Sequence, residues 1–302
     1  MVQVISKIIF NKKWQLAVLA IIIVAGILIF RYIRDNPVLP QSAIPFLKDI
    51  ELPASGEIIL IFSPHPDDET IACGGYIAES IKKGAKVYII LVTDGNKHGL
   101  RDVRYQEFKK ATGSLGVMEE NLVFLNYPDG GLASVDPVEL QKALAEQIAE
   151  YHPHILFYPH PGDMHQDHAT VGKITEKIFQ ELKDKVATKK DLEKYKELVR
   201  EEVWKELVAI EQIVNKMASY KYLVHHDVFP HPKKYAPDLY VLPPLNLIIA
   251  GAGGGWIKFL LSAETESLKD KALKSYVSQL KNPFLTGLLE ASIRKNELFA
   301  VD

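Results

Sequence analysis

Two polar clusters in the sequence combine histidine and carboxylate side chains at close spacing. The first occupies residues 63–69 (SPHPDDE), and the second occupies residues 160–168 (HPGDMHQDH). Neutral imidazole nitrogens and carboxylate oxygens are good ligands for zinc. Adjacent acids that lack a nearby cation repel one another, and this repulsion raises their pKa values. Together, the two clusters indicate a divalent-metal site with a His/Asp/His set of ligands.

Short apolar segments rich in β-branched residues precede both clusters. We expect strands at 58–62, 86–93, 122–125 and 155–158, and helices from the first cluster to about 83, at 101–115 and at 137–151. This alternation predicts βαβ units, and therefore a Rossmann-like, three-layer αβα fold with a mostly parallel sheet. In such folds the site lies beyond the carboxyl ends of the strands. Because each cluster follows a predicted strand, the two should meet at one edge of the sheet.

The first cluster alone has a second interpretation. Asp67 or Asp68 can cap the following helix, and Glu69 is favourable near its positive end. The second cluster at a neighbouring strand end favours the metal site over simple capping.

Residues 64–69 (PHPDDE) resemble the hallmark motif of the PIG-L/LmbE-type de-N-acetylases, and the second cluster is similar to that family's later His-Asp-His segment. Corroborating similarities lie at 104–107 (RYQE), 127–130 (YPDG) and 294–299 (RKNELF). The resemblance covers about 57–302, apart from a charged helical stretch.

The resemblance implies that His65, Asp68 and His168 bind Zn²⁺ and that Asp67 is the general base. Three protein ligands leave a coordination position for a water, whose pKa zinc lowers, and Asp67 can accept its proton. His₂Asp sites also accept other divalent ions, so Fe²⁺ and Co²⁺ remain alternatives.

Other residues of the two motifs receive supporting roles by the same resemblance. We expect His165 to donate to the oxyanion of the intermediate, and Asp167 to orient His165 or His168. Arg104 and Asp129 are expected to contact sugar hydroxyls or a neighbouring group of the substrate.

In one respect the chain departs from the family pattern. Some members have a Tyr shortly before the position of His165, where this chain has Asp163 and Met164. His225 or His226 is a candidate for the missing polarising group.

The implied reaction is hydrolysis of the N-acetyl group of an N-acetylglucosamine-containing substrate, which is lipid-linked, conjugated or polymeric. One alternative is an amidase that acts on another sugar-conjugate amide. A second alternative is a membrane-tethered, non-catalytic carbohydrate-binding protein.

Composition excludes several other classes of protein. The 302 residues carry a net charge of −2 without a basic block, so nothing indicates nucleic-acid binding. Cys73 is the only cysteine and lies in an apolar stretch, which excludes both an internal disulfide and a Cys-rich zinc site. Gly251 to Gly255 lacks the Lys-Ser/Thr of a phosphate-binding loop.

The N-terminal region predicts a membrane anchor. Residues 1–13 form a short basic segment, and 14–34 contain an uncharged run from Trp14 to Phe30. At about 1.5 Å per residue this run reaches roughly 25 Å, which is enough for a short membrane span. A cleavable signal peptide is the alternative, although no clear cleavage site follows. The basic groups before the run outnumber those after it, which predicts an extracytoplasmic catalytic domain.

The remaining chain divides by composition. Residues 35–56 carry four prolines and are expected to form a linker, followed by a deacetylase domain over 57–302. Within it, 181–217 is a charged insertion predicted to be one long helix, with an apolar stripe that runs from Leu192 to Val214. The stripe either packs on the domain or belongs to a protruding arm.

Overall fold

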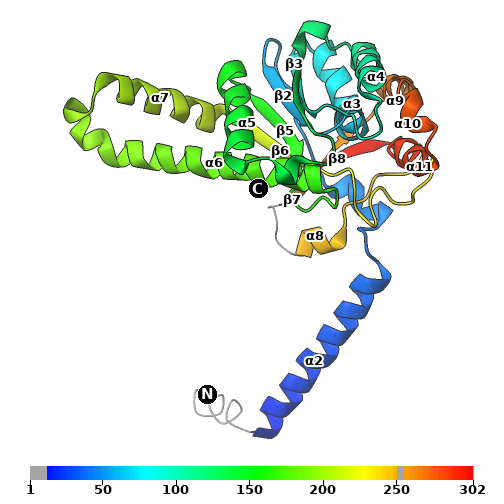
Figure 1. Cartoon of the computed structure of the whole chain (residues 1–302). Coiled ribbons are helices and arrows are strands. Elements are labelled where there is room, and N and C mark those ends of the chain that lie inside the picture. The colour runs from blue at the N-terminus through cyan, green and yellow to red at the C-terminus, as the bar shows by residue number, and fades with distance from the viewer. Residues whose placement is uncertain (1–11, 250–254, 302) are drawn as a thin grey trace.

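The computed structural model describes residues 12–249 and 255–301, and its centre is one eight-stranded sheet (Figure 1). The strands are β1 (Lys48–Asp49), β2 (Ile58–Ser63), β3 (Lys86–Thr93), β4 (Leu122–Tyr127), β5 (Ile155–Pro159), β6 (Ala218–Tyr222), β7 (Gly255–Leu260) and β8 (Asn296–Val301). Their order is β1-β7-β8-β6-β5-β2-β3-β4. Strands β2 to β6 pair in parallel, whereas β8 pairs antiparallel with both β6 and β7.

Helices cover both faces of this sheet. The helices are α2 (Lys12–Asp35), α3 (Asp68–Lys82), α4 (Arg101–Ser114), α5 (Pro137–Tyr151), α6 (Gln166–Leu192), α7 (Glu201–Lys216), α8 (Leu245–Ile249), α9 (Ala263–Leu273), α10 (Val277–Leu280) and α11 (Pro283–Ala291). Short 3₁₀ segments are η1 (Gln41–Phe46), η2 (Glu119–Asn121), η3 (Leu132–Ser134) and η4 (Glu193–Leu198). The expected α/β fold is therefore present, with a mixed sheet.

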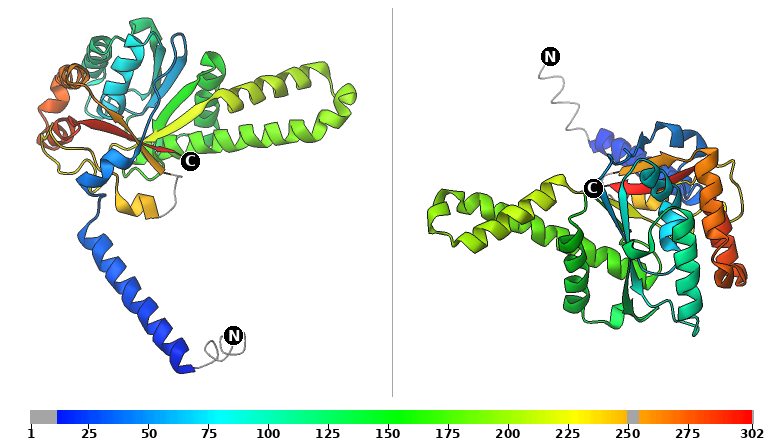
Figure 2. Two further views of the ribbon diagram at one scale, coloured as in Figure 1. Left: turned by 180° about the vertical axis from the view of Figure 1, so that it is seen from behind. Right: turned by 90° about the horizontal axis from the view of Figure 1, so that it is seen from above.

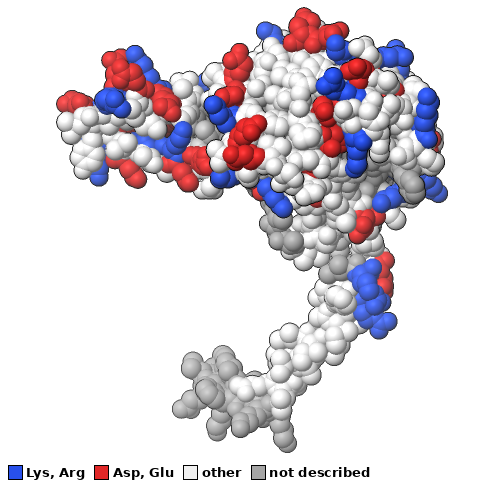
Figure 3. Space-filling model, viewed as in Figure 1, with Lys and Arg blue, Asp and Glu red and all other residues white. Residues whose placement is uncertain are grey.

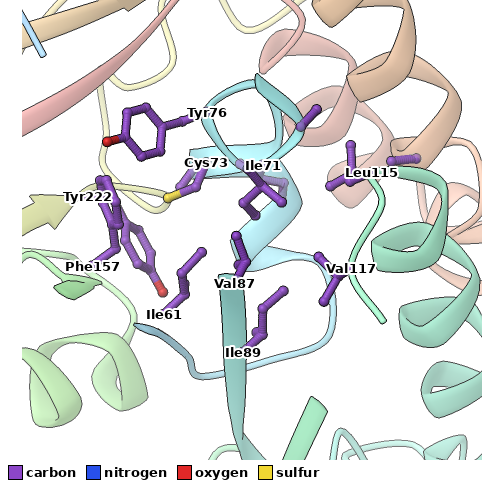
Figure 4. Packing of buried hydrophobic residues seen from close by; sticks show 14 of the residues in the cluster. Ile61, Ile71, Cys73, Tyr76, Val87, Ile89, Leu115, Val117, Phe157 and Tyr222 are labelled. Carbon is purple, nitrogen blue, oxygen red and sulfur yellow. The ribbon is translucent and has the colours of Figure 1, made fainter. Parts of the chain in front are cut away.

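Side chains along a strand point alternately to the two faces of the sheet, and this explains the two layers of helices. Ile59 and Ile61 of β2 pack with α3, α4 and α9 on one face, and Leu60 and Phe62 pack with α5 and α6 on the other. This two-residue period is the pleat of a strand buried on both faces. Cys73 of α3 is fully buried in the first of these cores (Figure 4), and burial raises the pKa of its thiol. It is a small core residue.

The expected linker at 35–56 is instead part of the folded domain. β1 extends the sheet by pairing in parallel with β7. Leu39 donates its backbone N–H to Pro243 O at 3.1 Å, and Leu245 donates to Pro37 O at 2.8 Å. Proline fixes the backbone φ angle, and these hydrogen bonds hold the segment against residues 243–245. The linker prediction was wrong for this reason.

The charged insertion forms an arm rather than one helix on the domain surface. α6 and α7 run side by side away from the sheet, and the chain reverses at η4 (Figures 1 and 2). Val186 of α6 and Leu207 and Ile210 of α7 are buried. These buried apolar side chains thus pack between the two helices. Acidic and basic side chains lie on the outer surface of the arm (Figure 3).

Helix α2 projects from the domain as a separate rod (Figure 1). Its stretch Trp14–Tyr32 has a mean hydropathy of 2.3 and no buried residue, so its length and composition suffice to cross a membrane. A signal sequence would share these properties. The predicted basic segment 1–13 lies largely outside the described residues, as does most of the 251–255 glycine run.

Candidate metal centre

The two polar clusters meet at the carboxyl ends of β2 and β5, which are adjacent parallel strands. His65 lies in the turn after β2, and Asp68 is the first residue of α3. His168 lies in the first turn of α6, shortly after β5. Neighbouring parallel strands end at the same edge of a sheet, so residues 103 positions apart come into contact.

Three side-chain atoms converge on one point. His65 Nδ1 lies 3.2 Å from Asp68 Oδ2 and 3.2 Å from His168 Nε2. His168 Nε2 lies 3.0 Å from Asp68 Oδ2. Ligand atoms at about 2.0–2.2 Å from a tetrahedral zinc ion are about 3.3–3.6 Å apart. The donor set therefore fits a divalent ion after a small expansion, and its fourth position remains available.

The electrostatics of His65, Asp68 and His168, called the triad below, also favour a bound cation. Burial opposes ionisation of Asp68, but the adjacent His168 and His65 outweigh it and hold the pKa of Asp68 well below its ordinary value. Burial likewise opposes protonation of His168, yet Asp68 and Asp163 raise its pKa well above the ordinary value. The pKa of His65 is raised to about 9, against burial, by its contacts with Asp167 and Asp68. Nearby positive charge stabilises these buried carboxylates, and a bound divalent ion would supply it.

Carboxylates behind the triad fix the two imidazole rings. His65 Nε2 lies 3.0 Å from Asp167 Oδ2 and 3.4 Å from Asp129 Oδ1. His168 Nδ1 lies 3.4 Å from Asp163 Oδ2, as an ion-pair contact without good hydrogen-bond alignment. Such partners set the tautomer and orientation of a ligating histidine.

The structure corrects the expected partner of Asp167. Its carboxylate contacts His65, not His165 or His168, because the backbone N–H groups of Gly130 (2.7 Å) and Leu132 (3.1 Å) hold it toward the loop after β4. Only its backbone N–H reaches His165, donating to Nδ1 at 3.2 Å. The contact of Asp163 with His168 was not predicted, because the sequence marked Asp163 only as a departure from the family pattern.

Asp67 is next to the triad in sequence but separate from it in environment. Its backbone φ of 128° is in the left-handed region, which a residue with a side chain rarely adopts. Burial, followed by the negative charge of Asp68, raises the pKa of Asp67 to about 8, although Arg104 opposes the shift. The distance from Arg104 Nη2 to Asp67 Oδ2 is 3.6 Å.

Glu69 supports the turn that carries Asp67. Glu69 Oε2 accepts hydrogen bonds from Ser63 Oγ (3.0 Å) and from the backbone N–H of Asp67 (3.3 Å). Its Oε1 accepts from Thr70 Oγ1 at 2.6 Å and from Tyr276 Oη in a short hydrogen bond. Sequence reasoning missed this role of Tyr276, since the two residues are 207 positions apart.

Two further histidines lie beside the triad. His165 and His225 have ring centroids 5.2 Å apart, and the ring of His225 is 4.8 Å from that of His168. Burial is the main reason that both pKa values are lowered, that of His225 to about 4. Of the two candidates at 225 and 226, the structure brings only His225 to the triad, whereas His226 Nε2 lies 3.4 Å from Asn246 Nδ2.

A cavity of about 270 Å³ opens over this cluster. It is lined by the triad member His65, by Asp67, His165 and His225, by Lys97, His98, Arg104 and Asp129, and by Gln279, Asn282, Leu285 and Leu288. The last four come from α10, α11 and the turn between them, which sequence reasoning did not assign to the site. Only their position in the folded chain identifies them.

Arg104 and Asp129 reach the cavity but are largely engaged with the protein. Arg104 Nη1 donates to Asp129 Oδ2 at 3.0 Å and to Gly95 O at 3.2 Å, and Nη2 donates to Pro66 O at 3.1 Å. Arg104 therefore braces the turns that carry Asp67 and Asp129, in addition to the substrate contact expected of it.

Residues 60–179 match a protein-family model described as PIG-L, GlcNAc-PI de-N-acetylase. A diacetylchitobiose deacetylase of Thermococcus kodakarensis is 30% identical over 126 residues, which cover 38% of this chain and 46% of that protein. Over residues 60–179 the chain is therefore similar to the PIG-L de-N-acetylase family. A probable N-acetyl-α-D-glucosaminyl L-malate deacetylase 2 of Bacillus anthracis is 27% identical over 128 residues, covering 38% and 56% of the two chains.

Solved structures of similar fold extend over more of the chain. N,N'-diacetylchitobiose deacetylase from Pyrococcus horikoshii has a TM-score of 0.51 and 20% identity, covering 80% of this chain and 82% of that chain. A conserved protein from Thermus thermophilus has a TM-score of 0.52 and 20% identity, covering 80% and 93%. At this level of identity the likenesses show a shared fold. The match to the curated relatives is shorter and spans about half of their length.

Proposed function

We propose that this chain is a PIG-L/LmbE-type, metal-dependent N-deacetylase that hydrolyses the N-acetyl group of an N-acetylglucosamine-containing substrate. The observation that carries the proposal is the convergence of His65 Nδ1, Asp68 Oδ2 and His168 Nε2 beside the separate carboxyl group of Asp67. The relatives described above include a probable N-acetylglucosaminyl L-malate deacetylase and a diacetylchitobiose deacetylase, which supports this substrate class.

His65, Asp68 and His168 would hold the ion, and Zn²⁺ suits two imidazoles and one carboxylate. Fe²⁺ and Co²⁺ are the alternatives that the same donors accept. When bound, the ion supplies a Lewis acid and lowers the pKa of a water molecule. Asp163, Asp167 and Asp129 keep the two imidazole rings in their ligating orientation.

Asp67 carries the protons. As a carboxylate it accepts a proton from the attacking water, and the C–N bond then breaks to give acetate and an amine. The same proton passes to the leaving nitrogen, so the acid is regenerated as a base. Burial and the neighbouring charge of Asp68 raise the pKa of Asp67, which favours its protonated form as the proton donor to the leaving nitrogen.

His165 and His225 are placed to polarise the acetyl carbonyl. Their lowered pKa values keep both rings neutral near pH 7, so that each has one N–H to donate. Donors directed at a developing oxyanion stabilise the transition state. His225 takes the position in the reaction that the missing Tyr would otherwise fill.

The cavity matches a substrate of which only one part enters. Its volume of about 270 Å³ is at the small end of ligand sites. Leu285 and Leu288 form an apolar wall that can pack against the carbon face of a sugar ring or against an attached apolar group. The remainder of a lipid-linked, conjugated or polymeric substrate would stay outside.

We also propose that α2 is a single-pass membrane anchor, which would hold the active site near a membrane-attached substrate. The support is the apolar, fully exposed stretch Trp14–Tyr32. The excess of basic residues before that stretch in the sequence supports an orientation with the domain outside the cytoplasm.

The test is release of acetate from a panel of N-acetylglucosamine-containing glycans and lipids, with metal content measured in parallel. We expect acetate from at least one substrate class, stoichiometric metal, and loss of both metal and turnover after chelation. Release of a larger acyl group but no acetate would favour the amidase alternative. Purified protein without stoichiometric metal, in which Asp67→Asn changes nothing, would favour a non-catalytic carbohydrate-binding protein.

A further inference from the structure

We propose that η1 and α8 form a membrane-docking face, which lies on the lipid surface around the point where α2 leaves the bilayer. The inference rests on the proposed anchoring by α2 and is independent of the deacetylase chemistry. The face is defined here by the exposed side chains of Phe46, Ile248 and Ile249.

These three residues are the large apolar side chains that the two elements leave exposed. Phe46 at the end of η1 is 89% exposed, and Ile248 and Ile249 at the end of α8 are 37% and 58% exposed. Their neighbours Leu47 and Leu247 instead pack against one and the same buried cluster, which contains Trp256. Both elements thus turn one apolar side inward and leave another outward.

The docking face is joined to the anchor through a short, ordered connection. Asn36 at the end of α2 donates to Tyr32 O at 2.8 Å, and Val38 forms an antiparallel bridge with Pro244, directly before α8. Gln41, the first residue of η1, exchanges hydrogen bonds of 2.9 Å with Tyr240 in both directions. α8 and η1 therefore lie on the side of the domain from which α2 emerges, as Figures 1 and 2 show.

A lipid surface is the occupant that fits these observations. An inserted α2 would bring the face to the membrane surface, so each exposed apolar side chain could leave water without a separate binding event. Cationic side chains lie near the same place. Arg31 and Arg34 are in the last turns of α2, where Arg34 pairs with Asp35 at 3.0 Å. Lys233 and Lys234 are exposed and follow His231 and Pro232, which share a cavity with Pro37 to Gln41. Basic groups at this level favour anionic headgroups.

Site-directed fluorescence can test the docking face on the full chain. Cys73 is the only cysteine and is buried, so single cysteines placed elsewhere can be labelled selectively. The test positions are Phe46→Cys and Ile249→Cys. Ile22→Cys on α2 reports insertion of the anchor, and Val138→Cys on α5, 68% exposed, is the matched control away from the face. Each labelled protein is reconstituted in phosphatidylcholine vesicles with a minority of phosphatidylglycerol, with and without a doxyl-labelled lipid.

We expect the doxyl lipid to quench the emission of labels at positions 22, 46 and 249, with little loss at 138. Iodide in the water should quench the label at 138 and spare those at 46 and 249. If the label at 22 is quenched by lipid while those at 46 and 249 behave like 138, the inference is overturned. Protection of 46 and 249 from both quenchers would mean that a protein covers the face, which also overturns it.

An unquenched label at position 22 would refute the anchor and the docking face together. Acetate release is measured separately, so failure of the deacetylase proposal leaves the fluorescence result interpretable. Thermal unfolding of each labelled variant, compared with the unsubstituted protein, confirms that the substitutions at these exposed positions leave the domain folded.

Discussion

Asp67 and Asp68 are adjacent and both buried, yet their carboxyl groups have opposite pKa shifts. Asp68 lies within 3.2 Å of two imidazole rings, which stabilise its charged form. Asp67 has only the guanidinium of Arg104 at 3.6 Å, and burial together with the charge of Asp68 favours its neutral form. Neighbouring acids with pKa values driven apart are typical of sites that divide ligand and proton-transfer roles.

Replacing the two kinds of residue should separate these roles. Asp67→Asn should retain the metal and lower kcat by about 10²–10⁴-fold, because a proton carrier is lost while the three donors remain. His65→Ala should lose the metal itself. Metal content by elemental analysis and acetate release check both, and equal metal loss in the two variants would contradict the division.

The pH dependence of stability provides a second test at Asp67, in protein stripped of metal. The pKa of this group is raised from 3.8 to about 8 on folding, so the folded chain binds a proton that the unfolded chain releases in between. The resulting stabilisation is full below 3.8 and is lost as pH rises through about 8. Asp67→Asn removes this contribution, so its melting temperature should fall less than that of the unsubstituted protein from about pH 5 to 8. Parallel curves for the two proteins would show that Asp67 does not titrate in this way.

At the scale of elements, the site depends on hydrogen bonds that hold the segment beginning at Tyr276 against the turn after β2 and against α4. Tyr276 donates to Glu69 behind Asp67, and Ser278 donates to Glu107 on α4 through both its backbone N–H (2.7 Å) and its hydroxyl (2.6 Å). The next residues of this segment form one wall of the cavity. The substrate wall and the strained turn are therefore parts of one hydrogen-bonded assembly.

Tyr276→Phe should loosen that turn without removing a catalytic group. We expect kcat to fall on the order of tenfold, with KM and metal content little changed, because a small displacement of a reacting group strongly lowers the rate of the chemical step. Tyr76→Phe is the control, since it removes the hydroxyl of another buried tyrosine, which donates to Glu51 O away from the site. Equal effects of the two substitutions on kcat would show that Tyr276 acts only through stability.

The packing of α6 on the end of β5 gives a separate prediction. A Cβ added at Gly172 would lie 2.5 Å from Pro159 O and 2.9 Å from Pro161 N, and backbone atoms cannot yield easily. Gly172→Ala should therefore displace α6 near His168, destabilise the protein by about 1–3 kcal/mol and weaken metal binding. Gly113→Ala on α4, where nothing lies within 4 Å, should stabilise by about 0.5–1 kcal/mol. Thermal unfolding and metal titration distinguish the two, and a neutral Gly172→Ala would contradict the close packing.

At the scale of the whole molecule, a compact α/β domain carries two projections, the rod α2 and the arm of α6 and α7 (Figures 1 and 2). The two projections differ in how they treat their apolar side chains. In the arm, the helices bury Val186, Leu207 and Ile210 against each other. In α2 the apolar side chains have no partner within the described part of the chain, so only the rod requires a different environment.

The arm should open independently of the domain. Leu207→Ala removes one of its few buried side chains and should speed hydrogen exchange in α7 and the outer part of α6, with β2 and β5 unchanged. Acetate release should stay near that of the unsubstituted protein, because the site lies at the opposite end of α6. Faster exchange in the strands to the same extent would show that the arm and domain unfold as one unit.

Much of the fold and part of the site follow from the sequence because their signals are local. The apolar, β-branched composition of 58–62 and 86–93 by itself predicts buried strands. The clusters at 63–69 and 160–168 directly follow strands. Parallel pairing then suffices to bring His65, Asp68 and His168 to one edge. The apolar length of α2 is equally local.

The contacts that join distant segments follow only from the packing of the whole chain. The partnership of Asp167 with His65, the hydrogen bond from Tyr276 to Glu69 and the cavity wall at 279–288 depend on how the C-terminal third returns across the sheet. The same is true of residues 35–56, whose pairing with β7 and with residues 243–245 has no signal in their own composition. Periodicity reports which side of an element is buried, whereas the partner it is buried against is settled only when the whole chain packs.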